Sequence, residues 1–69
     1  MIEILGVKYI TEKEASHRYG YSMAWFQKQR HKNLAPHYTR ITNTGKGRVL
    51  YPLEETDHWF RMQIQKNDR

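Results

Sequence analysis

A three-residue junction, Gly20-Tyr21-Ser22, constrains the fold of this chain more than any other feature. Glycine adopts the left-handed conformation that ends many helices, and Ser22 is a preferred N-cap that begins a new one. Upstream, Thr11 and Glu14 have the spacing of a capping box, which predicts that a first helix starts there and runs to the junction. Two helices joined by a turn this short form a helix-turn-helix unit.

The second predicted helix runs from Met23 to about His31 or Lys32, because residues 33–36 include a proline and break the helix. Its inward side is expected to come from four candidates, namely Trp25 or Phe26 together with Gln29 or Arg30. The rest of its surface is polar and basic.

Two β-hairpins flank this unit in the sequence. Residues 2–10 alternate apolar and polar side chains around a Leu-Gly turn, and residues 38–41 and 48–51 form a second pair of strands. The second pair is joined by the glycine-containing segment 42–47. We expect the first hairpin to extend the sheet of the second, because two strands alone are marginally stable.

A third helix is predicted to start near Leu53, because Pro52 stops the preceding strand and several acids then suit a helix N-terminus. The apolar face of this helix is expected to consist of Leu53, Thr56, Trp59 and Phe60, then Gln63 or Ile64. Residues 65–69 are expected to form a polar tail. The sequence therefore predicts one α+β domain, residues 1–69 with a core in 10–64. It would be a winged helix-turn-helix of three short helices, with a β-hairpin wing and an N-terminal β-hairpin.

The composition excludes several classes of protein. The chain has 69 residues, which allow one domain, and no Cys, which excludes disulfides and thiolate metal sites. It has no apolar run long enough to span a membrane, and its start lacks the basic and apolar regions of a signal peptide. We therefore expect a soluble, cytoplasmic protein.

Positive charge is concentrated in the middle of the chain. The net charge is +5, and the stretch from Arg18 to Arg48 holds seven Lys and Arg residues but no Asp or Glu. An acid-free stretch of this length favours a polyanionic partner over simple solvation of the surface. The charge falls on the second helix and the second hairpin.

The sequence contains no recognisable catalytic or metal-binding motif. Its four His lack the paired spacing of a zinc site, and Ser22 is explained by capping. Glu54, Glu55 and Asp57 suit a helix dipole rather than paired catalysis. The Gly-Lys-Gly sequence at 45–47 is not a phosphate-binding loop of nucleotide enzymes. We predict no enzymatic activity, no cofactor and no bound metal.

Several short motifs follow one another along residues 10–60. They are Glu14-Ala15 before Gly20, Ser22 through Phe26, Pro36-His37-Tyr38, Arg40-Ile41, Arg48 through Tyr51, and Glu54-Glu55 followed by Asp57 through Phe60. Their order and spacing resemble the small excisionase/AlpA-type branch of the MerR-like winged-helix superfamily. Trp25, Gln29 and the long segment 42–47 depart from the pattern of that family.

The resemblance implies sequence-specific binding of double-stranded DNA by a phage or mobile-element protein. Such a protein would be an excisionase (a recombination directionality factor) or a small transcriptional regulator, in a bacterial cell or phage-infected host. The implied partners besides DNA are further copies of the chain along the DNA or a recombinase. A protein-interaction module that uses the same fold to bind a repressor or recombinase is the alternative, and an RNA binder is a third class.

In a winged helix the second helix, here residues 22–32, enters the major groove, and its N-terminal residues meet base edges. The candidate DNA-binding residues on this helix are Ser22, Met23, Ala24, Gln27, Lys28, Arg30, His31 and Lys32. Gln27 suits adenine and Lys28 suits guanine, whereas the three residues near the helix end suit phosphates.

The wing, residues 40–49, supplies the candidates Arg40, Lys46 and Arg48, which suit phosphates or a narrow minor groove. Arg40 is equally suited to an ion pair with an acid of the third helix. Arg18 has a simpler role available, which is to solvate the first helix. Trp25 is expected in the core rather than stacked on a base.

Overall fold

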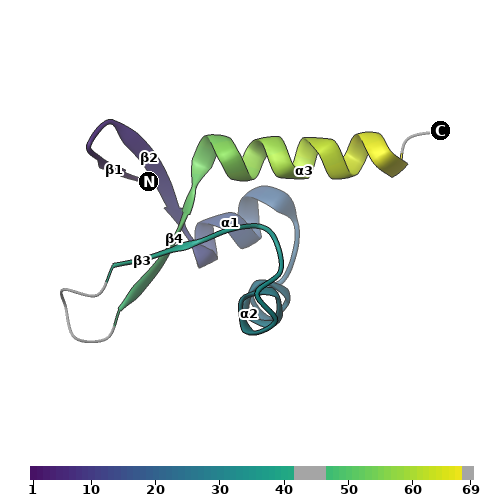
Figure 1. Ribbon diagram of the computed structural model, residues 1–69, viewed down its shortest axis with the longest axis horizontal. Helices are drawn as coiled ribbons and strands as arrows, with labels where there is room; N and C mark the ends of the chain where they lie inside the picture. Colours follow the sequence, from purple (N-terminus) through teal and green to yellow (C-terminus); the bar gives the residue numbers. More distant parts are fainter. Residues whose placement is uncertain (42–46, 68–69) are drawn as a thin grey trace.

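The computed structural model describes residues 1–41 and 47–67, and within them the fold is α+β (Figure 1). Four short strands form one antiparallel sheet in the order β1-β2-β4-β3, accompanied by three helices. The elements are β1 (Ile2–Ile4), β2 (Val7–Thr11), α1 (Glu12–Tyr19), α2 (Met23–His31), β3 (Thr39–Ile41), β4 (Arg48–Pro52) and α3 (Leu53–Asn67).

The first hairpin extends the sheet, as predicted. β2 pairs with β1 on one side, where Ile2 lies opposite Tyr9, and with β4 on the other, where Tyr9 lies opposite Pro52. Leu5 and Gly6 have φ values of 51° and 81° between β1 and β2. Two successive positive φ angles are typical of the tight turn that joins twisted antiparallel strands. The β1–β2 hairpin is thereby held by β4 instead of standing alone.

The junction between α1 and α2 is confirmed in detail. The Thr11 hydroxyl accepts the N–H of Glu14 at 3.1 Å, and the Glu14 carboxylate accepts the N–H of Thr11 at 2.9 Å. Gly20 ends α1 at φ 76°, and the Ser22 hydroxyl accepts the N–H of Trp25 at 3.1 Å to start α2. These local bonds satisfy backbone groups that a helix end otherwise leaves without partners.

An aromatic core holds the helices against the sheet. Its buried members are Ile10, Ala15, Phe26, Leu50, Tyr51 and Phe60. Phe26 of α2 is fully buried and lies between Tyr51 of β4 and Phe60 of α3, with ring centroids 5.3 and 6.3 Å away. Phe26 is therefore the central inward residue of α2. Trp25 and Trp59 pack around this core and are partly buried.

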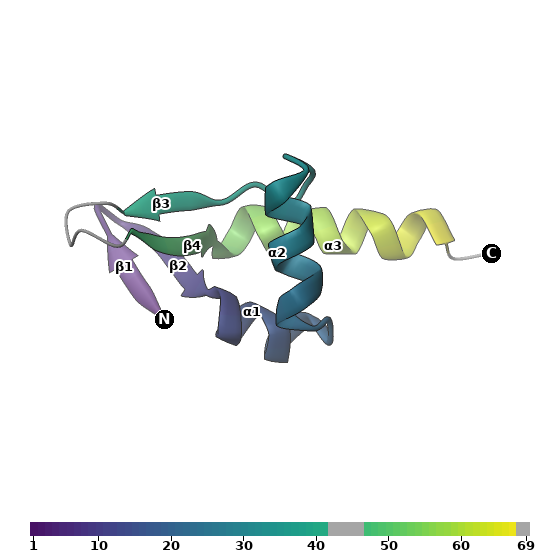
Figure 2. The same cartoon turned by 90° about the horizontal axis from the view of Figure 1, so that it is seen from below.

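The third helix is longer than predicted. It runs through Asn67, so it includes residues 65–67 of the predicted polar tail. Of the two residues considered for its fourth inward position, Gln63 is partly buried and Ile64 is 66% exposed. In both views the C-terminal half of α3 projects beyond α1 and α2 (Figures 1 and 2).

Candidate nucleic-acid interface

α2 and the β3–β4 hairpin are presented on one side of the molecule. In Figure 1, α2 is seen end-on below α1, and α3 lies above them. In Figure 2, which looks from below, α2 crosses in front of the other helices, and β3 and β4 extend from beside it. The helix and the hairpin that carry the predicted site residues are therefore neighbours on an accessible side.

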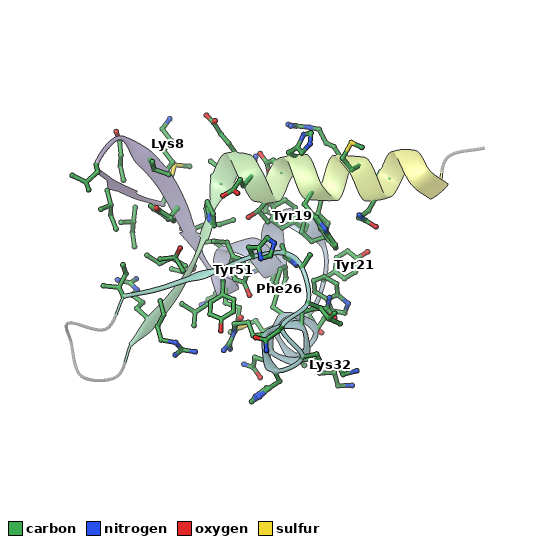
Figure 3. The ribbon with its side chains drawn as sticks, viewed as in Figure 1. Lys8, Tyr19, Tyr21, Phe26, Lys32 and Tyr51 are labelled. Carbon is green, nitrogen blue, oxygen red and sulfur yellow. The ribbon has the colours of Figure 1, made fainter. Side chains whose placement is uncertain are left out.

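Most of the predicted residues of α2 lie on its exposed face. The exposed side chains are Met23, Ala24, Gln27, Lys28 and His31, followed by Lys32 at the helix end. They recur at three- and four-residue spacing, which places them on one side of a helix, while the buried Phe26 faces the opposite way. Figure 3 shows Lys32 at the outer end of this face. α2 contains no Asp or Glu, so this face carries only neutral and basic groups.

Ser22 is exposed at the start of the same face. Its oxygen already accepts the N–H of Trp25, but its hydroxyl proton is available to donate to another acceptor. Ser22 therefore lies on the exposed face, where the sequence predicts it, and it also caps the N-terminus of α2.

Arg30 departs from the expectation that it reaches outward. Its side chain is only 18% exposed, and its Nε and Nη2 atoms donate to the two carboxylate oxygens of Glu12 at 2.8 and 3.2 Å. The Tyr51 hydroxyl donates to the same carboxylate at 3.0 Å. We assign Arg30 to holding α2 in place rather than to the external face.

The cluster formed by Glu12, Arg30 and Tyr51 joins α1, α2 and β4 at one point. The hydrogen bond with Glu12 raises the pKa of Arg30, which keeps the guanidinium charged. Burial, together with the hydrogen bond to Glu12, raises the pKa of Tyr51 and keeps its hydroxyl proton in place. The position of α2 relative to the sheet is thus fixed by charged hydrogen bonds as well as by the Phe26 contact.

A second carboxylate cluster joins α1 to α3. Arg18 donates through Nε and Nη2 to Asp57 at 2.9 and 2.7 Å, and the Tyr19 hydroxyl donates to Asp57 at 2.6 Å. The hydrogen bond from Arg18 is the largest cause that lowers the pKa of Asp57 below its usual value. The expectation that Arg18 only solvates the first helix is therefore wrong. Besides lying near the N-terminus of α3, Asp57 connects α3 to α1 through these hydrogen bonds.

These two clusters reduce the number of unpaired basic residues in the stretch from Arg18 to Arg48. Of its seven Lys and Arg residues, Arg18 and Arg30 are paired with acids from outside the stretch. Lys28, Lys32, Arg40 and Arg48 make no salt bridge within the part of the chain that the structure describes. Within the described part of this stretch, the basic residues without a salt bridge therefore all lie on α2, at its C-terminal end or on the β3–β4 hairpin.

The hairpin presents two of its three predicted residues. Arg40 on β3 and Arg48 on β4 are exposed, whereas Lys46 lies outside the described residues. The guanidinium of Arg40 lies 5.9 Å from the centre of the Tyr38 ring, and its stem runs against Gly47. A Cβ at position 47 would come within 3.2 Å of that stem, so the glycine leaves room for it. Arg40 makes this aromatic contact rather than the ion pair with α3 that was the other option.

Residues 1–41 and 47–67 contain neither a metal-binding cluster nor a membrane-spanning helix. No group of three or more His, Cys, Asp or Glu side chains is arranged to hold a metal ion. None of the described helices is long and apolar enough to cross a membrane.

No protein-family model, no curated protein and no solved structure matches the chain significantly. Sequence analysis missed Glu12 and Tyr51 as residues that position α2. Their contacts span 18 and 39 residues of sequence, and no local pattern in the chain indicates them.

Proposed function

We propose that this chain is a small winged-helix protein that binds double-stranded DNA. α2 enters the major groove, and the β3–β4 hairpin acts as the wing on the backbone or in the minor groove. The observation that carries this proposal is the acid-free outer face of α2, which lies beside a hairpin of the same charge. An α-helix fits the major groove, and Lys and Arg neutralise the phosphates on either side.

The side chains along α2 divide into two groups. Met23 and Ala24 at its start suit apolar contact with a thymine methyl, and Gln27 one turn on suits the N6 and N7 edge of adenine. Lys28 suits the O6 and N7 atoms of guanine. His31 and Lys32 at the helix end suit phosphates, which fix the position of the helix without reading sequence. Arg30 takes no part, because Glu12 holds it.

The hairpin contributes to the affinity for DNA more than to the selection of a particular DNA sequence. Arg40 and Arg48 have long, exposed side chains that suit phosphates or the minor groove, and we include Lys46 with them on sequence grounds. This division of labour rests on the chemistry of the side chains. A bidentate base contact needs a firmly placed donor, whereas attraction to a phosphate tolerates a range of geometries.

Within this function we propose two roles, DNA recombination as a phage or mobile-element excisionase, and transcription regulation by a small regulator. Both belong in the cytoplasm of a bacterial host. Selection of bound duplexes from a random pool separates them. Tandem direct repeats would indicate an excisionase that assembles copies along DNA beside a recombinase, whereas an isolated site would indicate a regulator.

The proposal is tested by competition. A fluorescent duplex is titrated with the protein at two salt concentrations, and unlabelled duplex DNA, RNA or heparin is added as competitor. Five basic side chains, the four exposed ones and Lys46, predict that log K falls against log salt with a slope of about −4 to −5. Preference for RNA would contradict the proposal. Little duplex affinity with weak salt dependence would instead favour the protein-interaction module.

A further inference from the structure

Two arginines lie against the ring of Tyr38, in the residues that lead from α2 into β3. The guanidinium of Arg30 on α2 is 5.8 Å from the ring centre, and that of Arg40 on β3 is 5.9 Å away. Both distances are within the range of a cation–π contact. Arg30 is also bound to Glu12, whereas Arg40 makes no salt bridge among the described residues. The same ring therefore contacts one arginine that is fixed in the fold and one that is exposed.

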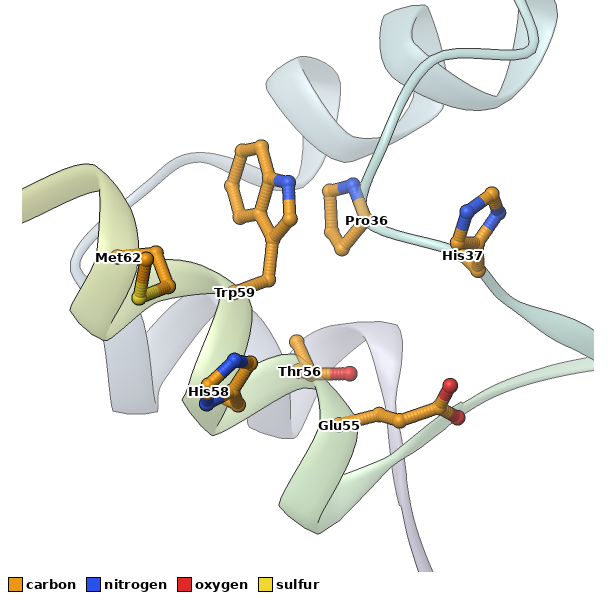
Figure 4. Close-up of a pocket in the computed structure, with 7 residues that line it drawn as sticks. All are labelled: Pro36, His37, Glu55, Thr56, His58, Trp59 and Met62. Atoms are coloured by element: carbon orange, nitrogen blue, oxygen red, sulfur yellow. The ribbon is translucent and has the colours of Figure 1, made fainter.

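Two contacts anchor the chain just before Tyr38. Gln29 of α2 donates through its side-chain amide to the carbonyl oxygen of Ala35 at 2.7 Å. Pro36 is buried, and its ring faces the side chain of Trp59 on α3 (Figure 4). The residue that follows Tyr38 is the first of β3 and is paired with β4. Tyr38 is thus tied to α2, α3 and the sheet, so its ring is a fixed surface at the base of the hairpin.

The stem of Arg40 is held as well. A Cβ at position 47 would come within 3.2 Å of the Arg40 Cδ atom and 3.3 Å of its Cγ atom, so the stem lies directly over the backbone of Gly47. Arg48, on the adjoining strand, is exposed and makes neither an ion pair nor a cation–π contact within the described residues. The two arginines of the hairpin are therefore not equivalent, although both are exposed.

We propose that Tyr38 is a positioning residue of the DNA interface, a role that rests on the proposed function. Its ring holds the guanidinium of Arg40 near α2, in the place where that group meets a backbone phosphate. A guanidinium is planar, so it can lie with its face against an aromatic ring and still present its N–H groups to a phosphate. The contact between Tyr38 and Arg40 is therefore kept when DNA binds.

Holding Arg40 in place before binding raises the affinity for DNA. An arginine side chain has several rotatable bonds, and fixing them against a partner costs conformational entropy. Tyr38 and Gly47 already restrict these bonds in the free protein, so Arg40 loses less freedom than Arg48 when it contacts a phosphate. We therefore expect Arg40→Ala to weaken duplex binding more than Arg48→Ala does.

A double-mutant cycle on duplex binding, measured by fluorescence anisotropy, tests the role of Tyr38. Tyr38→Leu removes the ring but keeps an apolar side chain, and it should weaken binding by about two- to fivefold, as expected for an exposed cation–π contact. Tyr38→Phe keeps the ring and should bind within about twofold of the wild type. In the Arg40→Ala background, Tyr38→Leu should have no further effect, because the group that the ring positions is gone. In the matched Arg48→Ala background it should keep its full effect.

A measurement on the free protein tests the contact without DNA. The ¹⁵N relaxation of an arginine Nε–H group reports how far that side chain moves on the fast timescale. Arg40 should be more restricted than Arg48 in the wild type and in Tyr38→Phe. In Tyr38→Leu, Arg40 should move as freely as Arg48. The comparison within the wild type needs no variant, so it tests the contact even if Tyr38→Leu proves unstable.

The outcomes separate this role from the proposed function. A wild type that binds no duplex DNA would overturn both, whatever the relaxation shows. Duplex binding that Tyr38→Leu weakens equally in the Arg40→Ala and Arg48→Ala backgrounds would leave the proposed function standing and overturn the role of Tyr38, since the ring would then act through the fold. An Arg40 side chain as mobile as Arg48 in the wild type would overturn that role too. Circular dichroism melting curves identify a temperature at which the compared variants are folded.

Discussion

Replacing Arg30 by methionine should destabilise the domain strongly, although Arg30 is a basic residue on a helix with a basic surface. Methionine preserves most of the side-chain length. Among the described residues it leaves the Tyr51 hydroxyl as the one remaining donor to the Glu12 carboxylate, and the Glu12 side chain is 11% exposed. Breaking a buried ion pair costs about 3–5 kcal/mol. Because the Arg30 side chain is 18% exposed and water can reach part of the site, we expect about 2–4 kcal/mol.

That loss is large for a domain of this size. At about 0.05–0.15 kcal/mol per residue, the whole chain is stable by about 3–10 kcal/mol. Urea unfolding followed by tryptophan fluorescence and by far-UV circular dichroism measures the loss, and agreement of the two probes supports a two-state analysis.

Glu12→Gln in the Arg30→Met background is the decisive control. Glutamine keeps an acceptor for Tyr51 but has no charge that needs a counter-ion, so the double variant should regain about 1–2 kcal/mol relative to Arg30→Met. Arg18→Met breaks a pair of the same geometry in which the arginine side chain is 47% exposed, and it should cost about 1 kcal/mol or less. A neutral Arg30→Met, or a further loss in the double variant, would refute the reasoning.

Three other predictions concern the aromatic core, the Arg18–Asp57 pair and the β3–β4 hairpin. Phe26→Ala removes a fully buried ring and should lower the free energy of unfolding by about 3–5 kcal/mol, measured by urea unfolding. Arg18 lowers the pKa of Asp57, so the stability that this pair contributes is present above about pH 4 and is lost as the pH falls through the folded-state pKa. Asp57→Asn should therefore flatten the dependence of the melting temperature on pH in that window. Arg40→Ala combined with Arg48→Ala should weaken binding to all duplexes alike and reduce the salt slope by about one to two units, while an altered consensus sequence would make the hairpin a reading element.

The sequence predicts those parts of the fold that depend on neighbouring residues. The Thr11 and Glu14 capping box, the Gly20 helix end and the Ser22 cap each act within a few residues, so their side chains identify them directly. The same holds for the outer face of α2, which follows from helical periodicity once the start of the helix is known. Seven of the eight residues expected on that helix lie on this face, and Arg30 is the exception.

The remaining features depend on contacts across the fold. The neighbouring sequence does not separate Arg18 and Arg30, which form ion pairs, from Lys28 and Lys32, which do not. The difference is that Asp57 lies near Arg18 and Glu12 lies near Arg30 in the folded chain. Helical periodicity also does not decide which of two neighbouring residues, such as Trp25 and Phe26, is the more deeply buried. The arc of a helix that faces the core is wide enough to include either. Packing against the rest of the molecule makes that choice.

The central claim is that the outer face of α2 contacts duplex DNA, and two matched lysines test it most directly. Lys32 lies at the outer end of α2, and Lys8 lies on β2 at the opposite side of the molecule (Figure 3). Lys32→Glu and Lys8→Glu change the net charge equally, so any difference between them reports on position. In fluorescence anisotropy with duplex DNA at about 0.1 M salt, Lys32→Glu should weaken binding by about tenfold or more, and Lys8→Glu by less than about threefold. Equal losses, or a larger loss for Lys8→Glu, would contradict the claim.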